Sequence, residues 1–167
     1  MYIALSVNIA EAAKNCSTNW AELNGECIYF GRTPTSWTSA LEQCKGKGGY
    51  LLTDDNEEKH SFLTNIASLL YGFGEENYWI GGTDEIIEGS WRWVETGMPM
   101  TNFDKWSRGY PTTNASNNCL YMAWENGELR WRDSPCQKPS THHGKRASGI
   151  KIGKTSPGNY FYICEKP

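Results

Sequence analysis

The sequence predicts one α+β domain in which two helices are followed by a series of short strands, with disulfide bonds tying the chain together. Apolar residues recur at helical spacing in two stretches, residues 37–44 and 62–70. From residue 78 onward the apolar runs are short and interrupted by glycines, which is typical of strands. A length of 167 residues suits a single domain, and six cysteines, an even number, favour disulfides.

Composition argues against several classes of protein. Charged residues make up 21% and aromatic residues 13% of the chain, which argues against intrinsic disorder. No apolar run approaches the ~20 residues that span a bilayer. A formal net charge of −3 provides no general basic field, so nucleic-acid binding is disfavoured. Because only 38% of residues are hydrophobic, the core must depend on aromatic rings and covalent links.

The cysteines indicate an oxidising compartment and hence a secreted protein. None lies in a C-x-x-C pair. Disulfides are therefore favoured over a zinc site, with free buried thiols as the remaining alternative. The count alone leaves the pairing open. Two N-x-S/T sequons, at Asn15 and Asn114, agree with a secreted glycoprotein.

Residues 1–15 are treated apart from the domain. They contain a short apolar stretch that is broken by Asn8, with small residues near its end and no basic region at its start. They are interpreted either as the remnant of a signal peptide or as a disordered leader. The domain is therefore placed at residues 16–167.

The first elements are a hairpin and a helix. Asn24-Gly25 is a strong turn signal, and residues 27–30 follow it as a strand. Residues 31–35 are expected to form a loop. The apolar spacing of residues 37–44 predicts a helix with Thr35 or Ser36 as its N-cap, ending at the glycine-rich residues 46–49.

A second helix follows the short apolar run at residues 50–52. Asp55 and Glu58 have the spacing of a capping box at its start, and Gly72 marks its end. The predicted apolar face consists of Phe62, Ile66 and Leu69, with Leu63 and Leu70 beside them. Strands are then expected at residues 78–82, 90–94, 120–124, 129–131 and 160–164, with a hairpin turn at 125–128.

Two stretches have no regular period. Residues 97–118 form a long polar loop, and long loops in compact domains are often functional. Residues 137–159 carry five basic residues and no acid: Lys138, Lys145, Arg146, Lys151 and Lys154. This basic insertion is interpreted as a solvated loop, as a patch for sulfated glycans, acidic surfaces or a partner protein, or as misassembled sequence. Its vicinal His142-His143 make a weak metal site at best.

Together these residues resemble a C-type lectin-like domain of the long form, from about Cys16 to Lys166. Residues 79–82 (Trp-Ile-Gly-Gly) resemble the family's core strand, and residues 163–166 (Ile-Cys-Glu-Lys) its last strand. The resemblance implies two helices flanking small antiparallel sheets, with a long polar ligand loop. It also implies three disulfides: Cys16–Cys27, Cys44–Cys164 and Cys119–Cys136.

Members that bind sugar through calcium hold the ion in an oxygen cage on the long loop, and this chain departs from that pattern. The tripeptide at residues 110–112 reads Tyr-Pro-Thr, without the ligands on either side of the proline. Asn117 and Asn118 stand where an acid is usual, and Arg132 stands before Asp133 where an asparagine is expected. Since a guanidinium only donates hydrogen bonds and repels cations, the usual calcium cage is predicted to be lost.

Sugar binding does not require the ion, because an aromatic platform with convergent polar groups is sufficient. Trp37, Trp79 and Trp93 are assigned to the core, whereas Trp106 and Trp131 are taken as exposed platforms. Arg132 would suit an acidic sugar, or it would simply pair with Asp133. The candidate sugar-binding residues are Tyr110, Thr112, Asn117, Asn118, Trp131, Arg132 and Asp133.

No cofactor is expected to be required. Asp84 and Glu88 match two ligands of the family's auxiliary calcium position, so weak Ca²⁺ binding there is one interpretation, and a solvated acidic loop is the other.

The resemblance implies a secreted carbohydrate-binding lectin that recognises glycans on cells or microbes, as in innate immunity. The alternative is a protein-binding module without sugar activity. An enzyme is not expected, because catalytic motifs are missing and the histidines, including His60, lack evident partners. All six cysteines pair within the implied pattern, so any homodimer is expected to be non-covalent.

Overall fold

The computed structural model describes residues 16–71, 76–137 and 158–167. The expectations for residues 1–15 and for nearly all of the basic insertion lie outside these described residues. Among the described residues, no helix is long and apolar enough to cross a membrane.

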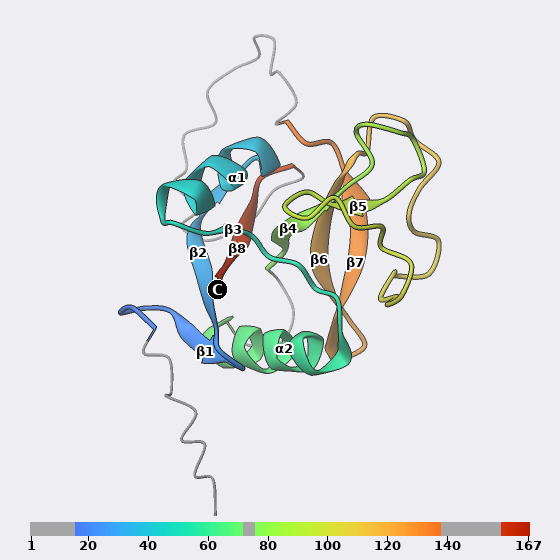
Figure 1. The fold of residues 1–167 in the computed structure, drawn as a ribbon. Helices are drawn as coiled ribbons and strands as arrows, with labels where there is room; N and C mark the ends of the chain where they lie inside the picture. Colours follow the sequence, from blue (N-terminus) through green and yellow to red (C-terminus); the bar gives the residue numbers. More distant parts are fainter. Residues whose placement is uncertain (1–15, 72–75, 138–157) are drawn as a thin grey trace, which may run out of the picture.

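One mixed sheet organises the molecule (Figure 1). Its strand order is β1-β2-β8-β4-β6-β7, with β3 pairing with β8 and β5 with β4. All pairings are antiparallel except that of β4 with β8, which is parallel. The strands are β1 (Ala21–Leu23), β2 (Glu26–Thr35), β3 (Tyr50–Leu51), β4 (Tyr78–Thr83), β5 (Arg92–Trp93), β6 (Cys119–Glu125), β7 (Glu128–Ser134) and β8 (Tyr160–Lys166).

The expected α+β fold with two helices and antiparallel strands is confirmed, and the parallel pair adds one feature to it. The last strand, β8, inserts between β2 and β4 and so joins the two antiparallel ribbons into one sheet. Strand β2 is also longer than expected. It continues to Thr35 through the stretch expected to be a loop, and its pairing with β8 resumes at Thr35 after a shift in register.

The two helices begin at polar caps. Helix α1 (Trp37–Gly46) has Ser36 as its N-cap, whose hydroxyl accepts a hydrogen bond from the Ser39 amide, which confirms one of the two expected caps. Helix α2 (Glu57–Tyr71) begins one residue after Asn56. The Asn56 side chain accepts from the Lys59 amide, so Asn56 is the cap and the expected capping box at Asp55 is wrong.

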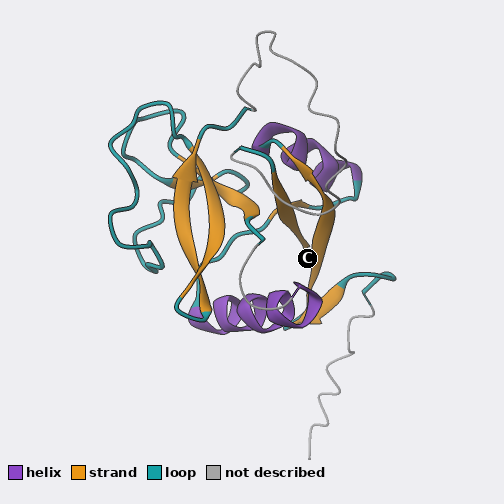
Figure 2. Ribbon diagram, turned by 180° about the vertical axis from the view of Figure 1, so that it is seen from behind, coloured by secondary structure: helices purple, strands orange, loops and turns teal. Residues whose placement is uncertain are grey.

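Neighbouring residues along the central strands point to opposite faces of the sheet, as the pleat requires. Tyr78, Ile80 and Met122 pack in the cluster that includes Leu63 and Ala67 of α2. The intervening Trp79 and Tyr121 pack in the cluster that includes Trp37 and Ala40 of α1. Figure 2 shows α1 and α2 on different sides of the strands.

The core assignments of Trp37, Trp79 and Trp93 are confirmed, since their exposed fractions are 4%, 0% and 4%. The predicted face of the second helix is only partly right. Leu63 is buried, whereas Leu69 is 81% exposed.

All three implied disulfides are confirmed: Cys16–Cys27, Cys44–Cys164 and Cys119–Cys136. The second joins α1 to β8, and the third joins the beginning of β6 to the residues that follow β7.

Candidate functional site

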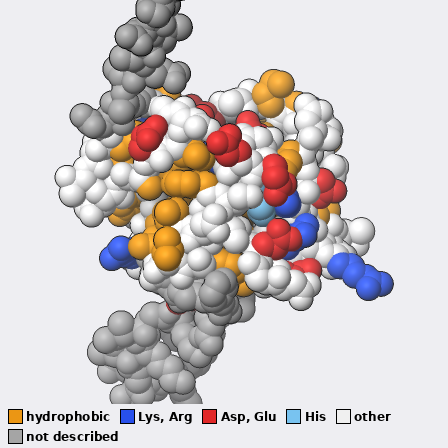
Figure 3. Space-filling view, turned by 90° about the horizontal axis from the view of Figure 1, so that it is seen from below, with side chains coloured by type: hydrophobic (Ala, Val, Ile, Leu, Met, Phe, Trp, Pro, Cys, Tyr) orange, Lys and Arg blue, Asp and Glu red, His pale blue; other side chains and the backbone are white. Residues whose placement is uncertain are grey.

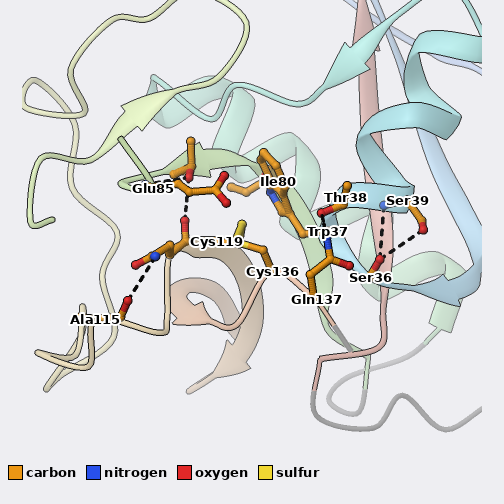
Figure 4. Close-up of a disulfide and its surroundings, with 12 residues drawn as sticks. Ser36, Trp37, Thr38, Ser39, Ile80, Glu85, Ala115, Cys119, Cys136 and Gln137 are labelled. Atoms are coloured by element: carbon orange, nitrogen blue, oxygen red, sulfur yellow. Dashed lines mark hydrogen bonds between the residues drawn. A yellow bond between two sulfur atoms is a disulfide. The ribbon is translucent and has the colours of Figure 1, made fainter. Parts of the chain in front are cut away.

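The long loop between β5 and β6 is fastened to the sheet at several points. The Trp131 amide donates to the Lys105 carbonyl at 2.8 Å, and the Ser107 amide donates to the Trp131 carbonyl at 2.9 Å. The Cys119–Cys136 disulfide closes the base of the loop beside α1 (Figure 4). There the Trp37 amide donates to the Cys136 carbonyl at 3.1 Å. The loop therefore has a fixed base on which its polar side chains are displayed.

Asp133 is buried beneath the loop and is satisfied by Thr112. The Thr112 amide donates to Asp133 Oδ1 at 2.8 Å, and the Thr112 hydroxyl donates to Oδ2. The Asn117 side-chain amide donates in turn to the Thr112 hydroxyl at 3.1 Å. Because Asp133 is only 4% exposed and both its oxygens accept hydrogen bonds from the protein, the carboxylate is not displayed to an ion.

Arg132 lies against Tyr110 and pairs with neither Asp133 nor any other acid of the loop. Its guanidinium carbon is 5.4 Å from the centre of the Tyr110 ring, within the range of a cation–π contact. Nη2 donates to Glu125 at 2.9 Å, and Nε donates to the Ser107 hydroxyl at 3.0 Å. The expected Arg132–Asp133 pair is therefore wrong. Glu125 already balances the charge of Arg132, so recognition of an acidic sugar stays a prediction.

Asn118 belongs to a different cluster from Tyr110 and Asp133. Its carbonyl accepts from the Thr83 hydroxyl at 2.7 Å and from the Asp84 amide at 3.3 Å. Its side-chain amide donates to Ala115. The predicted site residues therefore divide between two clusters. Asn117 belongs to the cluster of Thr112 and Asp133, and Asn118 belongs to the cluster of Thr83 and Asp84.

The Asp84–Asn118 cluster has oxygens that fit a cation. Asp84 Oδ1 and Asn118 Oδ1 are buried and have no hydrogen-bond partner among the described residues. Burial raises the pKa of Asp84. Glu88, the other expected ligand, is exposed. Within the described ranges, no group of three or more His, Cys, Asp or Glu side chains is placed to hold a metal ion. Asp84 and Asn118 could therefore supply only a partial oxygen set to Ca²⁺.

Trp131 is a core residue, and its expected role as an exposed platform is wrong. Its exposed fraction is 0%. Its indole nitrogen donates to Asp54 Oδ2 at 2.7 Å, and its ring packs edge-on against Trp93 and Trp106. Trp106 is half-buried in the same group of rings.

The group around Asp54 was not predicted from the sequence. His60 Nδ1 lies 2.7 Å from Asp54 Oδ2, so the histidine does have a partner. Both side chains are buried, and burial raises the pKa of Asp54. Asp54 and Trp131 are 77 residues apart in the sequence, so no local pattern could have revealed the contact. Ser107 was missed for the same reason, since it lies 25 residues from Arg132. Glu125 is only seven residues from Arg132, across the predicted hairpin, so that contact was within reach of the sequence.

The family model described as the Lectin C-type domain matches residues 33–142. The chain belongs to the C-type lectin family. As a member of this family, the chain is not an enzyme.

Several relatives are similar to this C-type lectin chain over most of its length. A perlucin-like protein of Mytilus galloprovincialis is 30% identical over 137 residues, covering 81% of this chain and 85% of the relative. A type-2 ice-structuring protein of Hemitripterus americanus is 31% identical, covering 78% and 73%. The hepatic lectin of Gallus gallus is 27% identical, and the alignment covers 90% of this chain but 59% of that longer protein.

Solved structures show the same fold. The mouse scavenger receptor C-type lectin carbohydrate-recognition domain superposes with a TM-score of 0.68 at 23% identity, covering 90% of this chain and 95% of the other. A calcium-independent type II antifreeze protein gives a TM-score of 0.67 at 23% identity, covering 91% and 94%. A Ca²⁺-dependent type II antifreeze protein has the same fold. The C-type lectin fold therefore does not by itself decide whether calcium is bound.

Proposed function

We propose that this chain is a secreted carbohydrate-binding lectin whose long loop recognises a glycan without calcium in the usual cage. One observation carries the proposal. Thr112 donates to both carboxylate oxygens of buried Asp133, which is the last carboxylate remaining from the cage. Calcium needs six to eight oxygen ligands, and here protein hydrogen bonds occupy the oxygens of Asp133.

In this proposal the sugar is contacted by Tyr110, Arg132 and Asn117. Tyr110 and Arg132 are half-buried and stacked on each other, so they present an aromatic edge beside a planar donor. Asn117 is half-buried and supplies an amide oxygen. Thr112 and Asp133 hold these groups in place from below, while Trp131 has no part in the contact.

The similar structures support a glycan as the ligand class. One is described as the C-type domain of cow CD23 in the presence of an oligosaccharide, and another as a murine dendritic cell receptor domain in complex with N-glycan. Ca²⁺ is proposed only as an auxiliary ligand at Asp84 and Asn118, on the strength of their two unpartnered oxygens.

Secretion is supported by the three disulfides, which persist in oxidising compartments. The sequon at Asn114 lies on the exposed part of the long loop, which is where a glycan could be attached. A role in innate immunity stays part of the proposal.

The test is a glycan array probed with the purified chain in the presence of Ca²⁺ and of EDTA. We expect the same glycans to be bound in both conditions. Tyr110→Ala should weaken binding at least tenfold, because it removes the ring under Arg132. Thr113→Ala is the matched control, since Thr113 is a neighbouring exposed side chain. Binding that disappears with EDTA would overturn the calcium-free site.

Protein binding without sugar activity is the second candidate. Exposed apolar side chains beside the long loop, including Ile87 and Val94 with exposed fractions of 59% and 36%, favour it. An array on which no glycan is retained in either condition would support this candidate over the first.

A further inference from the structure

The large hydrophobic side chains that the described residues leave exposed fall on two separate surfaces. One surface lies on α2, and the other lies on the segments around β5. The residues with their exposed fractions are Leu69 81% and Leu70 40% on α2, and Ile86 87%, Ile87 59%, Val94 36% and Met98 60% around β5.

The surface around β5 has an acidic rim. Ile86, Ile87 and Val94 line a shallow hollow of about 90 Å³. Glu85 and Glu88 flank the two isoleucines, Glu95 follows Val94, and all three glutamates are exposed. None of these glutamates forms an ion pair with another described residue. We name residues 85–88 the acidic knob.

The surface at α2 is a hollow with a basic rim. A groove of about 520 Å³ runs between the N-terminal hairpin and α2, lined by Asn19, Trp20, Ala21, Ile28, Tyr29, Phe30, Arg32, Thr33, Ile66 and Leu70. We name it the basic groove, because Arg32 is its only charged lining residue. Figure 3, which views the molecule from below, shows hydrophobic side chains gathered on this face.

Two lysines add to the basic character of the groove. Lys166 Nζ lies 4.2 Å from the centre of the Trp20 ring, and Lys47 Nζ lies 4.7 Å from that of Tyr29. Both rings line the groove, although neither lysine is itself a lining residue.

We propose that this chain associates with itself head to tail, with the acidic knob of one copy seated in the basic groove of the next. The sizes match, because the two exposed isoleucines meet a largely apolar groove with a volume of about 520 Å³. The charges match as well, since Glu85 and Glu88 of the knob meet a groove whose charged lining residue is Arg32, with Lys47 and Lys166 held against two of its aromatic rings. An anionic membrane surface, by contrast, would repel the acidic knob.

The contact is heterologous, because the knob and the groove are different surfaces of one chain. Figure 1 places the segment that joins β4 to β5 far from β1 and from the C-terminal end of α2. Each copy in a pair therefore keeps one free knob or one free groove, and the association continues until a ring closes or a short filament forms. Such an assembly would display several long loops together and raise avidity for a repeated ligand. This inference does not rest on the proposed sugar binding.

The test is the mass of the full chain by sedimentation velocity over a hundredfold range of concentration. We expect the average mass to rise with concentration and to fall back when salt is added. A knob variant, Ile86→Ser with Ile87→Ser, and a groove variant, Leu70→Glu, should each remain monomeric. Mixed together they should form dimers and nothing larger, because the groove of the first accepts the knob of the second.

Matched controls distinguish this specific contact from nonspecific hydrophobic association. Leu69→Ser and Met98→Ser remove exposed apolar side chains that line neither the groove nor the hollow of the knob, so both should associate like the parent. Thermal melts establish that each variant is folded, and Arg32→Glu serves as a second groove variant. A parent that stays monomeric, a knob variant that associates like the parent, or a mixture without dimers would overturn the proposal.

Discussion

The hydroxyl of Thr112 links two polar side chains of the long-loop region, Asn117 and Asp133. Thr112 accepts from Asn117 and donates to Asp133, so it relays one hydrogen-bonded chain from the surface to a buried carboxylate. Together with its own amide it gives Asp133 two donors. A buried carboxylate without such donors is costly, so Thr112 stabilises the loop in the arrangement in which protein hydrogen bonds occupy both oxygens of Asp133.

Replacing Thr112 by valine should therefore destabilise the protein. We expect Thr112→Val to lower the free energy of unfolding by about 1–3 kcal/mol, because Asp133 loses one donor and Asn117 loses its acceptor. Urea unfolding measures the change. Thr112→Ser, which keeps the hydroxyl, should behave like the parent, and so should Thr113→Val at the exposed neighbour. Equal losses in Thr112→Val and Thr113→Val would show that the hydroxyl does not stabilise the loop.

At the residue scale the sequence showed which calcium ligands of the family pattern are replaced in this chain. It did not show which hydrogen bonds the replacing residues form. The loss of ligands around Pro111 and the cation at Arg132 can be seen in the letters alone. That Asp133 pairs with Thr112, 21 residues away, depends on how the loop folds back. The burial of Trp131 could have been predicted from the sequence. Leu129 and Trp131 are two residues apart on one strand, so they lie on the same face of the sheet, and both are buried.

At the scale of elements, Lys59 joins α2 to the terminal strand β8. Its ammonium lies 2.9 Å from Glu165 on β8 and 2.9 Å from Glu26 on β2. Glu165 also accepts from the Thr53 amide. Lys59 and Glu165 are both buried, and burial raises the pKa of Glu165 to about 7 from its ordinary value of 4.5.

Lys59→Met should destabilise the protein in a pH-dependent way. A raised pKa means that Glu165 contributes stability fully below pH 4.5, and that this contribution is lost as the pH rises through about 7. Removing Lys59 raises this pKa further, because the buried carboxylate loses its partner. We expect a loss of about 3–5 kcal/mol at pH 8 and a smaller loss at pH 5, where Glu165 is protonated, measured by denaturant unfolding.

The control combines Lys59→Met with Glu165→Gln. No buried charge is then left without a partner, so the combined variant should recover much of the loss at pH 8. A loss from Lys59→Met that is equal at pH 5 and pH 8 would contradict the assignment to Glu165.

The order of the helices and strands could be predicted from the sequence, because periodicity and turn residues are local. Their ends were harder to predict. Strand β2 continues past Gly31 because β8 pairs with it again at Thr35, and that pairing joins residues 125 positions apart. Leu69 matches the helical period of the core but is exposed, because the sheet covers only the side of α2 that carries Leu63 and Ala67.

At the scale of the whole molecule, one disulfide spans most of the domain. Cys44–Cys164 closes 120 residues, whereas Cys16–Cys27 closes 11. The family pattern gave this pairing correctly, although the cysteine count could not. The position of β8 between β2 and β4 could not be predicted from local sequence, because the parallel pairing of β4 with β8 produces no local sequence pattern.

The two disulfides should differ in their contribution to stability. From the dependence of loop entropy on length, the Cys44→Ala, Cys164→Ala pair should cost about 5 kcal/mol, and the Cys16→Ala, Cys27→Ala pair about 3 kcal/mol. Denaturant unfolding of both double variants under oxidising conditions gives the comparison. A larger loss from the N-terminal pair would mean that loop length does not determine the contribution.

The inward position of Trp131 has a consequence for the optical behaviour of the protein. The chain has eight tryptophans, and each of them is buried or half-buried. Their ultraviolet emission should therefore be centred at short wavelength and shift to the red on unfolding. A sugar bound at Tyr110 would leave that emission almost unchanged. Trp20, on the wall of the basic groove, is placed to respond when a second copy covers it.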